Sequence, residues 1–426
     1  GKLKKQNAEN LYDELKIIDE TRVASKIRGD DFTYKRKQIY AVYNSYKKYL
    51  LDQGKEDVFF PSEDIIEKQL SALEEYGIVV VDEAQDLLGS PLQILSKAGT
   101  NNEILFAADD NQTMQTTHRS TIEQLREMYY CGQRLELNIK KLSIVHRMPE
   151  NILKITENLL KLTHMLGGSL SKSSYFKFNP SSDHPSKGSV VYTNDTKTLK
   201  LFIEEKNPVI LVLDDSQITS AQEIYRKHFI TTVENFKGME VPYVLVLLPN
   251  DLDSLNKVGN LIIKADEKIT KEAIEKKVLN SHRLKSEASL DNDLRKLLNI
   301  IYVAGSRAQK KLVFTKTIDS KKTSSSRHFF ELLDNLCKDL ESEIIEDKEQ
   351  DLIALIKTLK EFLEKNDSEK ACYFFDSQIK PVIIKSIKDG EFSSVFEFYD
   401  SKLASIDKTE VIYQHIIDLA NNASDY

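Results

Sequence analysis

Residues 79–86 read VVVDEAQD: three β-branched apolar residues run directly into a turn with two adjacent carboxylates, Asp82 and Glu83. A short apolar run rich in β-branched residues is typical of a strand buried in a parallel sheet. In such sheets, ligands bind beyond the carboxyl ends of the strands. A carboxylate there can hold Mg²⁺ beside a phosphate, and a neighbouring acid can activate water. For the acidic pair alone, a plain surface turn is the alternative.

Strand and helix patterns alternate along the chain, which indicates an α/β fold with parallel sheets. The predicted strands are IVVVDE (78–83), EILFAADD (103–110), SVVYT (189–193), PVILVLDD (208–215) and YVLVLLP (243–249). The predicted helices are 39–51, 63–77, 149–162 and 221–229, and residues 298–315 are predicted to form a helix, a turn and a strand. Everything after 327 has helical periodicity, including 394–406 and 410–420.

These patterns divide the chain into five parts. They are a helical region at 1–76, a first α/β domain at 77–166, a linker at 167–188, a second α/β domain at 189–326 and an acidic helical domain at 327–426. Residues 331–426 contain 22 acidic residues and 11 lysines, whereas the rest of the chain has a net charge of +4. So small a positive charge on the body is weak evidence for a polyanionic partner.

Composition argues against several classes of protein. No apolar run approaches the roughly 18 residues that a membrane-spanning helix needs, and the polar first residues lack the apolar stretch of a signal peptide. Cys131, Cys337 and Cys372 are far apart and suggest neither a disulfide framework nor a zinc site. We therefore expect no membrane partner, and a cytoplasmic location or a nuclear one in a eukaryote.

Five stretches, taken in order, resemble the motifs of superfamily 1 helicases of the UvrD/Rep type. DEAQD (82–86), AADDNQTM (107–114), SIVHRMPENIL (143–153), TVENFKGMEVPYVLVL (232–247) and YVAGSRAQKKL (302–312) look like that family's second to sixth motifs. Each alone would be a weak signal, but together and in family order they are specific. The resemblance implies two RecA-like parallel-sheet motor domains, the first incomplete, with a helical insertion at 1–76 and a C-terminal helical domain.

The resemblance implies ATP and Mg²⁺ as ligands and assigns roles to motif residues. Asp82 and Glu83 would hold the metal ion, and Glu83 would be the general base for the attacking water. Gln112 would sense the γ-phosphate, and Arg147 and Arg307 would reach it from the second domain. An arginine offers a phosphate a planar fork of donors. For each arginine by itself, a surface salt bridge is the alternative.

The fifth motif would contact the sugar of the nucleotide. Glu240 would face the ribose, and Gly238 would allow the tight turn before it. A nucleotide between two domains, with carboxylates on one side and arginines on the other, would couple hydrolysis to domain closure. The implied partner is single-stranded nucleic acid, with DNA favoured over RNA.

The largest departure from the family pattern is the phosphate loop, GxxxxGK[ST], which cradles the phosphates of ATP. The Gly-Lys pairs at 1–2 and 54–55 are not followed by Ser or Thr. Several charged hydrogen bonds, each of roughly 1.5–3 kcal/mol, would therefore be lacking, and we expect this chain alone to hydrolyse ATP inefficiently. We expect an upstream segment or a partner chain to supply the loop.

Smaller departures concern the binding of a nucleic-acid strand. Ala108 replaces a glycine of the third motif, Glu234 stands where histidine is common, and Ser306 replaces threonine. Residues 114–116 (Met-Gln-Thr) replace a base-stacking aromatic residue, and the chain contains no Trp.

Three functions fit these observations. The first is a motor that moves on single-stranded nucleic acid once the phosphate loop is supplied. The second is a degenerate helicase fold used as a binding or regulatory module. The third is a nucleotide-dependent switch that acts on a protein partner through the C-terminal helical domain.

Overall fold

The computed structural model describes part of the chain. The described residues are 45, 48–50, 52–54, 78–87, 95, 104–112, 125, 138–167, 178–181, 184, 186–249, 292–316, 327–344, 348–365 and 367–388. The predicted helices at 63–77, 394–406 and 410–420 and the residues at 114–116 lie outside this set, as does most of the predicted linker at 167–188.

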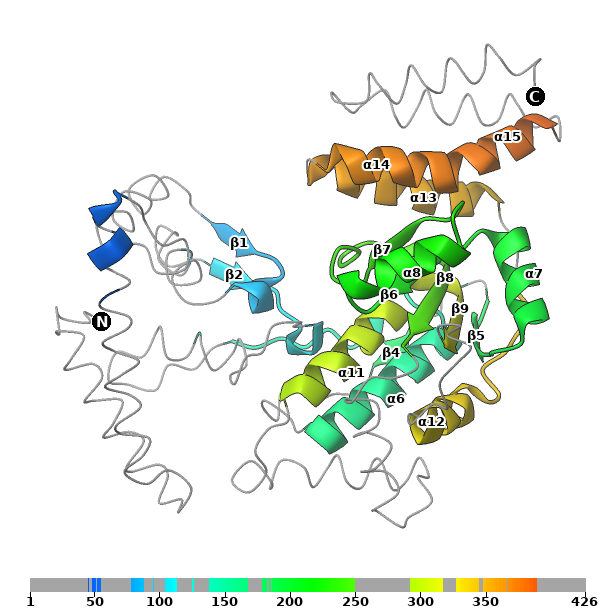
Figure 1. Ribbon diagram of the computed structural model, residues 1–426. Helices are drawn as coiled ribbons and strands as arrows, with labels where there is room; N and C mark the ends of the chain where they lie inside the picture. Colours follow the sequence, from blue (N-terminus) through cyan, green and yellow to red (C-terminus); the bar gives the residue numbers. More distant parts are fainter. Residues whose placement is uncertain are drawn as a thin grey trace. The chain divides into compact units, whose positions relative to one another are not determined.

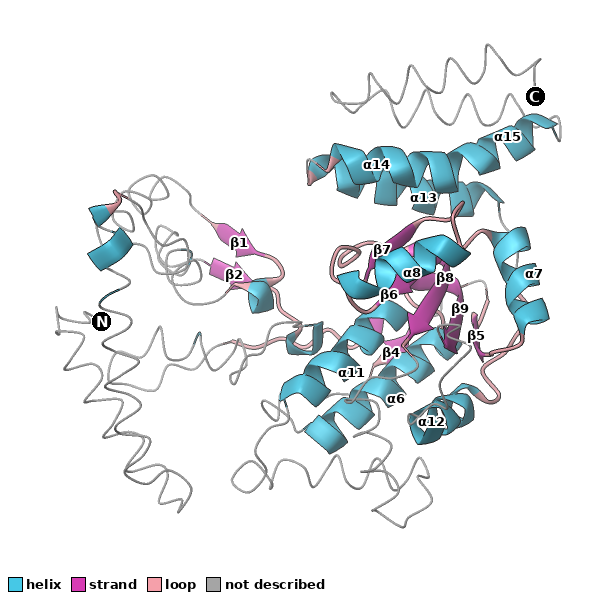
Figure 2. Ribbon diagram, viewed as in Figure 1, coloured by secondary structure: helices cyan, strands magenta, loops and turns pink. Residues whose placement is uncertain are grey.

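Contacts within the chain divide it into two compact units. The first is Gly1–Asp110 with Arg119–Lys140, and the second is Asn111–His118 with Lys141–Tyr426. All strand pairs in the described part of the chain are parallel. The prediction of an α/β fold with parallel sheets is therefore confirmed (Figures 1 and 2).

The first unit contains a two-stranded sheet made of β1 (Val79–Val81) and β2 (Ile104–Phe106). Side chains alternate between the two faces of a strand. Val81 is buried, whereas Val80 and its partner Leu105 are 64% and 61% exposed. Asp82 and Glu83 follow β1 and lead into the short 3-10 helix η1 (Ala84–Asp86), so the strand ends at the predicted acidic turn.

The second unit is built on a five-stranded parallel sheet in the order β5-β9-β8-β6-β7. Its strands are β5 (Ser189–Tyr192), β6 (Val209–Val212), β7 (Ile230–Thr232), β8 (Val241–Leu248) and β9 (Ala308–Lys316). A separate short pair is formed by β3 (Ile144–Val145) and β4 (Asn179–Pro180). Strands β6 and β8, which long apolar runs predicted, lie inside the sheet. Both of their faces are covered, which explains why their sequences are continuously apolar.

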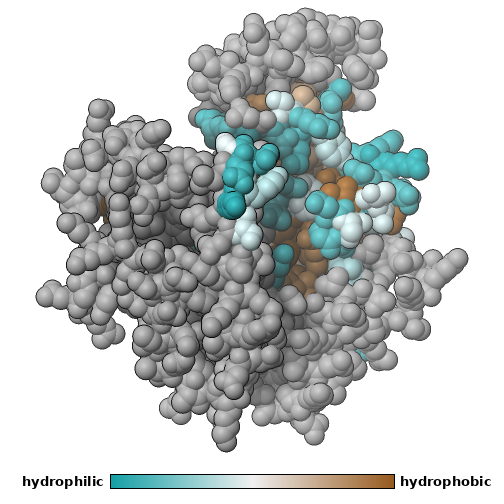
Figure 3. Space-filling model, turned by 60° about the vertical axis from the view of Figure 1, so that its left-hand side comes forward, coloured by the Kyte–Doolittle hydropathy of each residue, from teal (hydrophilic) through white to brown (hydrophobic). Residues whose placement is uncertain are grey.

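Alternate residues of the central strands enter two separate hydrophobic cores, one on each face of the sheet. One core joins the sheet to α6 (Glu150–Gly167) and α11 (Asn292–Gly305). The other joins it to α7 (Thr196–Lys206) and α8 (Ile218–Ile224), which follows the 3-10 helix η4 (Asp215–Gln217). On the face in Figure 3, hydrophilic residues cover much of the described surface and apolar ones show between them.

Helix α6 belongs to the second unit. The sequence division placed it in the first α/β domain, which was expected to extend to residue 166. In the structure α6 packs along α11 and against β5, and Ile152, Ile155 and Leu159 are fully buried in the larger core. The boundary falls near Lys141 because the apolar face of α6 can be covered only by elements that come later in the chain.

The helices after residue 327 extend the second unit rather than form a body of their own. They are α12 (Arg327–Cys337), α13 (Lys348–Glu364), α14 (Ser368–Phe374), the π-helix η6 (Phe375–Ile379) and α15 (Lys380–Lys388). Phe229, just before β7, contacts the rings of Phe362 on α13 and Phe374 on α14. The predicted boundary at 326/327 is thus crossed by a continuous core. No helix among the described residues could span a membrane.

The short strands β3 and β4 were not expected from the sequence, and neither were β7 and α7. Strand β7 starts one residue after the end of the predicted helix 221–229, because α8 stops at Ile224 and a turn follows. Helix α7 had a local signal, since the Asp195 carboxylate caps it by accepting a hydrogen bond from the Thr198 amide at 2.8 Å.

Candidate functional site

The acidic turn after β1 has a strained backbone and exposed carboxylates. Glu83 adopts φ 51° and ψ 36°, a left-handed conformation that costs a non-glycine residue roughly 1–2 kcal/mol. Its amide donates to Asp82 Oδ1 at 2.8 Å. The amides of Ala84 and Ala107 donate to Ala107 O and Val81 O, so the turn is anchored to both strands. Strain held by surrounding structure is common at functional sites.

Gln85, in the middle of this turn, was not assigned a role from the sequence. Its side chain is buried, and its Nε2 donates a hydrogen bond to Glu83 Oε2. Its Oε1 accepts from the Asp109 amide at 3.0 Å, just beyond the end of β2. Gln85 therefore fixes the direction of the Glu83 carboxylate relative to the neighbouring strand.

The acidic turn suits a hard cation in its donor chemistry. Asp82 and Glu83 offer exposed carboxylate oxygens, which are the ligands Mg²⁺ prefers. Among the described residues, no group of three or more His, Cys, Asp or Glu side chains is arranged to hold a metal ion. Any metal held there would take its remaining ligands from water or a phosphate, as Mg²⁺ commonly does.

The predicted residues of the second unit meet at the amino ends of two strands, not at the carboxyl ends. Glu240 immediately precedes β8, and Arg307 immediately precedes β9. The two strands are parallel neighbours with Val241 opposite Ala308, and the Val241 amide donates to Arg307 O at 3.0 Å. Parallel pairing in this register therefore brings Glu240 and Arg307 to the same edge of the sheet.

Arg307 is buried, with 1% of its surface exposed, and it is held by its own unit. Its Nε donates to Val303 O at 3.0 Å, and Nη1 donates to Met239 O at 3.3 Å. Nη2 donates to Ser306 Oγ at 2.7 Å and to Gln112 Oε1 at 3.4 Å. The guanidinium is thus bonded to the protein in this conformation, and the contact with Gln112 brings two predicted residues together.

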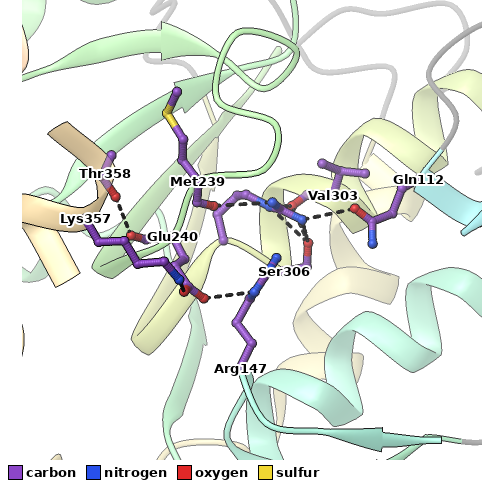
Figure 4. A network of polar contacts seen from close by, with 9 residues as sticks. Gln112, Arg147, Met239, Glu240, Val303, Ser306, Lys357 and Thr358 are labelled. Atoms are coloured by element: carbon purple, nitrogen blue, oxygen red, sulfur yellow. Dashed lines mark hydrogen bonds and ion pairs between the residues drawn. The ribbon is translucent and has the colours of Figure 1, made fainter. Parts of the chain in front are cut away.

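Arg147 and Glu240 form a second polar group next to the first. Arg147 Nε lies 2.9 Å from Glu240 Oε2, and Lys357 Nζ on α13 lies 2.6 Å from Glu240 Oε1 (Figure 4). The Glu240 side chain is 9% exposed, whereas that of Arg147 is 41% exposed. The contact of Arg147 with Glu240 is made by Nε, not by the terminal nitrogens Nη1 and Nη2. Arg147 is therefore the accessible arginine of the site.

Helix α13 holds the turn that leads to Glu240. Thr358 Oγ1 donates to Glu240 O at 2.7 Å, and Lys365 Nζ donates to Lys237 O at 3.1 Å. Gly238 lies between these contacts with φ 88°, as predicted for a tight turn. A Cβ at Gly238 would find Lys365 Nζ as its nearest neighbour, at 4.0 Å, so the turn is open on that side.

A further acid, Glu361, lies among these charges. Partial burial raises its pKa, and the negative charge of Glu240 acts in the same direction. The positive charges of Lys357, Lys365 and Arg147 oppose this rise. All five groups are thus close enough to influence one titration. None of Lys357, Thr358, Glu361 and Lys365 was identified from the sequence, because they lie more than a hundred residues from the turn.

The structure brings together five of the seven predicted site residues in the second unit. These are Gln112, Arg147, Gly238, Glu240 and Arg307. Asp82 and Glu83 belong to the first unit.

A scan against protein-family models and a search of curated proteins found no match to this chain.

Proposed function

We propose that this chain is a helicase or helicase-like protein of the UvrD/Rep type, with two RecA-like units. When complete, it would use ATP and Mg²⁺ to move along single-stranded nucleic acid, DNA rather than RNA. The main support is the meeting of Gln112, Arg147, Glu240 and Arg307, which come from four separate stretches of the chain. The helicase resemblance requires these residues to act on one nucleotide.

The chemistry of the residues fits a magnesium nucleotide. Arg147 has accessible terminal nitrogens that can grip a phosphate as a fork. Asp82 and Glu83 can hold Mg²⁺, and Glu83 is the candidate base because Gln85 orients its carboxylate. Arg307 would contact phosphate after giving up one of its present hydrogen bonds. Gln112 accepts one of those bonds, so its position would depend on whether Arg307 is bound to phosphate. ATP supplies the phosphoanhydride bond whose cleavage would drive the unit.

Hydrolysis by these 426 residues should be slow, because the sequence contains no GxxxxGK[ST]. The lysine and backbone amides of such a loop are major ligands of the β- and γ-phosphates. We expect weak but measurable nucleotide binding and little turnover. Turnover by this chain at the 1–100 s⁻¹ order common for phosphoryl-transfer enzymes would refute this part of the proposal.

The test measures binding of a fluorescent ATP analogue with Mg²⁺, together with release of phosphate. Arg147→Ala should weaken binding about tenfold or more, since a charged hydrogen bond is lost. Glu83→Gln should abolish any residual turnover, and it should also weaken binding in the presence of Mg²⁺, because a candidate metal ligand is lost. Lys360→Ala, an exposed lysine of α13 that pairs with Glu364, is the matched control and should change neither. Binding that is equally strong in wild-type and Arg147→Ala protein would refute the nucleotide site.

The second candidate is a regulatory or binding module that has lost nucleotide use. It is favoured by two observations: Arg307 is buried and bonded internally, and Glu240 is already paired with two cations. Under this alternative, a labelled single-stranded oligonucleotide would bind, but neither ATP nor ADP would change its affinity. A nucleotide-dependent change in that affinity would favour the motor.

A further inference from the structure

Helix α13 places a stripe of charged residues against the turn at 237–240. Lys357, Glu361 and Lys365 are spaced by four residues, so they lie on one face of the helix and its final turn. Lys357 contacts the side chain of Glu240, and Lys365 contacts the backbone of the turn. No motif of the sequence includes this helix, although its charges lie among those of the proposed site.

The charges around the turn do not balance. Three cations, Arg147, Lys357 and Lys365, face two carboxylates, Glu240 and Glu361. Burial is the largest cause of the raised pKa of Glu361, and the three cations act against that rise. One cation would be enough to attach α13 to the sheet through Glu240. Glu240 pairs with two, Arg147 and Lys357, and Lys365 contacts the same turn.

The three cations also keep donors available. Lys357 and Lys365 each make one contact with the turn, and an ammonium group has three hydrogens. The Lys357 side chain is 56% exposed, and Lys365 is exposed. Gly238 carries no side chain, so nothing of its own covers the backbone between them. An anion could therefore approach the turn and contact several donors together.

We propose that Lys357 and Lys365 form, with Arg147, a phosphate-binding site that extends from the 237–240 turn onto α13. Its ligand is the polyphosphate chain of a nucleotide, and in this respect the inference rests on the proposed function. The C-terminal helical segment, which the sequence suggested was a separate acidic domain, then contributes cations to the nucleotide site.

The experiment measures binding of inorganic tripolyphosphate by calorimetry at low salt. The Lys357→Met/Lys365→Met double variant keeps the apolar stems of both lysines and should bind at least about tenfold more weakly than wild type. The Lys357→Arg/Lys365→Arg variant should retain binding. Lys360→Met is the matched control, because Lys360 lies on the same helix and pairs with Glu364 at 3.8 Å. Double-variant binding within twofold of wild type, or an equal loss in Lys360→Met, would overturn the proposal.

A measurement on the wild-type protein guards against misfolding of the double variant. Lysines are acetylated with and without tripolyphosphate, and the modified sites are quantified by mass spectrometry. We expect tripolyphosphate to protect Lys357 and Lys365 severalfold and to leave Lys360 unprotected. Equal modification of all three lysines under both conditions would refute the site.

Competition with ATP separates this inference from the proposed function. If ATP displaces tripolyphosphate and both depend on the two lysines, both proposals are supported. If tripolyphosphate binding depends on the lysines but ATP does not compete, the anion site stands and the nucleotide function fails. If ATP binds equally well to the double variant, the lysine site fails and the nucleotide function stands. If the two lysines affect the binding of an oligonucleotide but not of ATP or tripolyphosphate, the proposal of a nucleotide polyphosphate as ligand is refuted.

Discussion

The carboxyl end of β1 and the amino ends of β8 and β9 are the two places where predicted site residues gather, and they differ in construction. At β1 the carboxylates are exposed, and the bonds that shape the turn span a short stretch of chain. At β8 and β9 the charged groups pair with residues that are distant in the sequence, such as Lys357 with Glu240, and Arg307 is buried. A local motif can shape the first place, whereas the second exists only when the unit is folded.

The largest effect should follow from removing the buried arginine. Arg307→Met removes the hydrogen bonds of the guanidinium to Met239 O, Val303 O and Ser306 Oγ, although Val303 O keeps the one from Ser306 Oγ. Since a hydrogen bond from a charged group contributes about 1.5–3 kcal/mol, we expect the unfolding free energy to fall by about 3 kcal/mol or more. Arg147→Met, at an exposed pair, should cost about 1 kcal/mol or less. Urea unfolding followed by far-ultraviolet circular dichroism measures both, since the chain has no Trp for fluorescence. Similar losses for the two variants would contradict the contrast between buried and accessible arginine.

A smaller loss of unfolding free energy should follow from adding a methyl group in the turn before Glu240. Gly238→Ala should cost roughly 1–2 kcal/mol, because φ is positive while the added Cβ has space. Gly188 also has a positive φ, but a Cβ there would lie 2.6 Å from Pro149 Cγ. Gly188→Ala should therefore be the more destabilising of the two in the same urea assay. If Gly238→Ala were the more destabilising variant, the turn at 237–240 would have less space for a Cβ than the structure indicates.

In the acidic turn of the first unit, a change to glycine should increase stability, whereas the loss of a glycine at 238 should decrease it. Glu83→Gly removes the strain of a left-handed glutamate, so we expect local stabilisation of about 1 kcal/mol relative to Glu83→Gln, which keeps the strain. Hydrogen exchange at the amides of Ala84 and Ala107 should then be about fivefold slower in the glycine variant. Faster exchange in that variant would mean that the glutamate side chain, not the backbone, determines the turn.

The smallest effect is expected on the exposed face of the first unit's sheet. Val80→Thr should change the unfolding free energy by less than about 0.5 kcal/mol, since Val80 is 64% exposed. Val246→Thr, at a fully buried position of β8, should cost about 1–3 kcal/mol because a hydroxyl is buried. If Val80→Thr were as costly as Val246→Thr, the two strands would not differ in burial as the structure indicates.

The sequence predicted the strands well where burial leaves a continuous apolar run. β6 and β8 are covered on both faces, so their sequences contain four or more consecutive apolar residues and were located within a few positions. β7 was missed because two of its three residues are threonines, so no apolar run marks it, and the residues just before it were assigned to a helix. The extent of the second unit was also missed, because the partners of α6 and α13 are distant in sequence.

For the candidate site, the sequence located charged residues but not their surroundings. It placed Asp82 and Glu83 at the end of a strand, and it required a glycine turn before Glu240, because both features depend on neighbouring residues. It could not show that Lys357 shares the Glu240 carboxylate with Arg147, or that Arg307 is enclosed. These facts depend on strand register and helix packing, which bring residues together only when the whole sheet has formed.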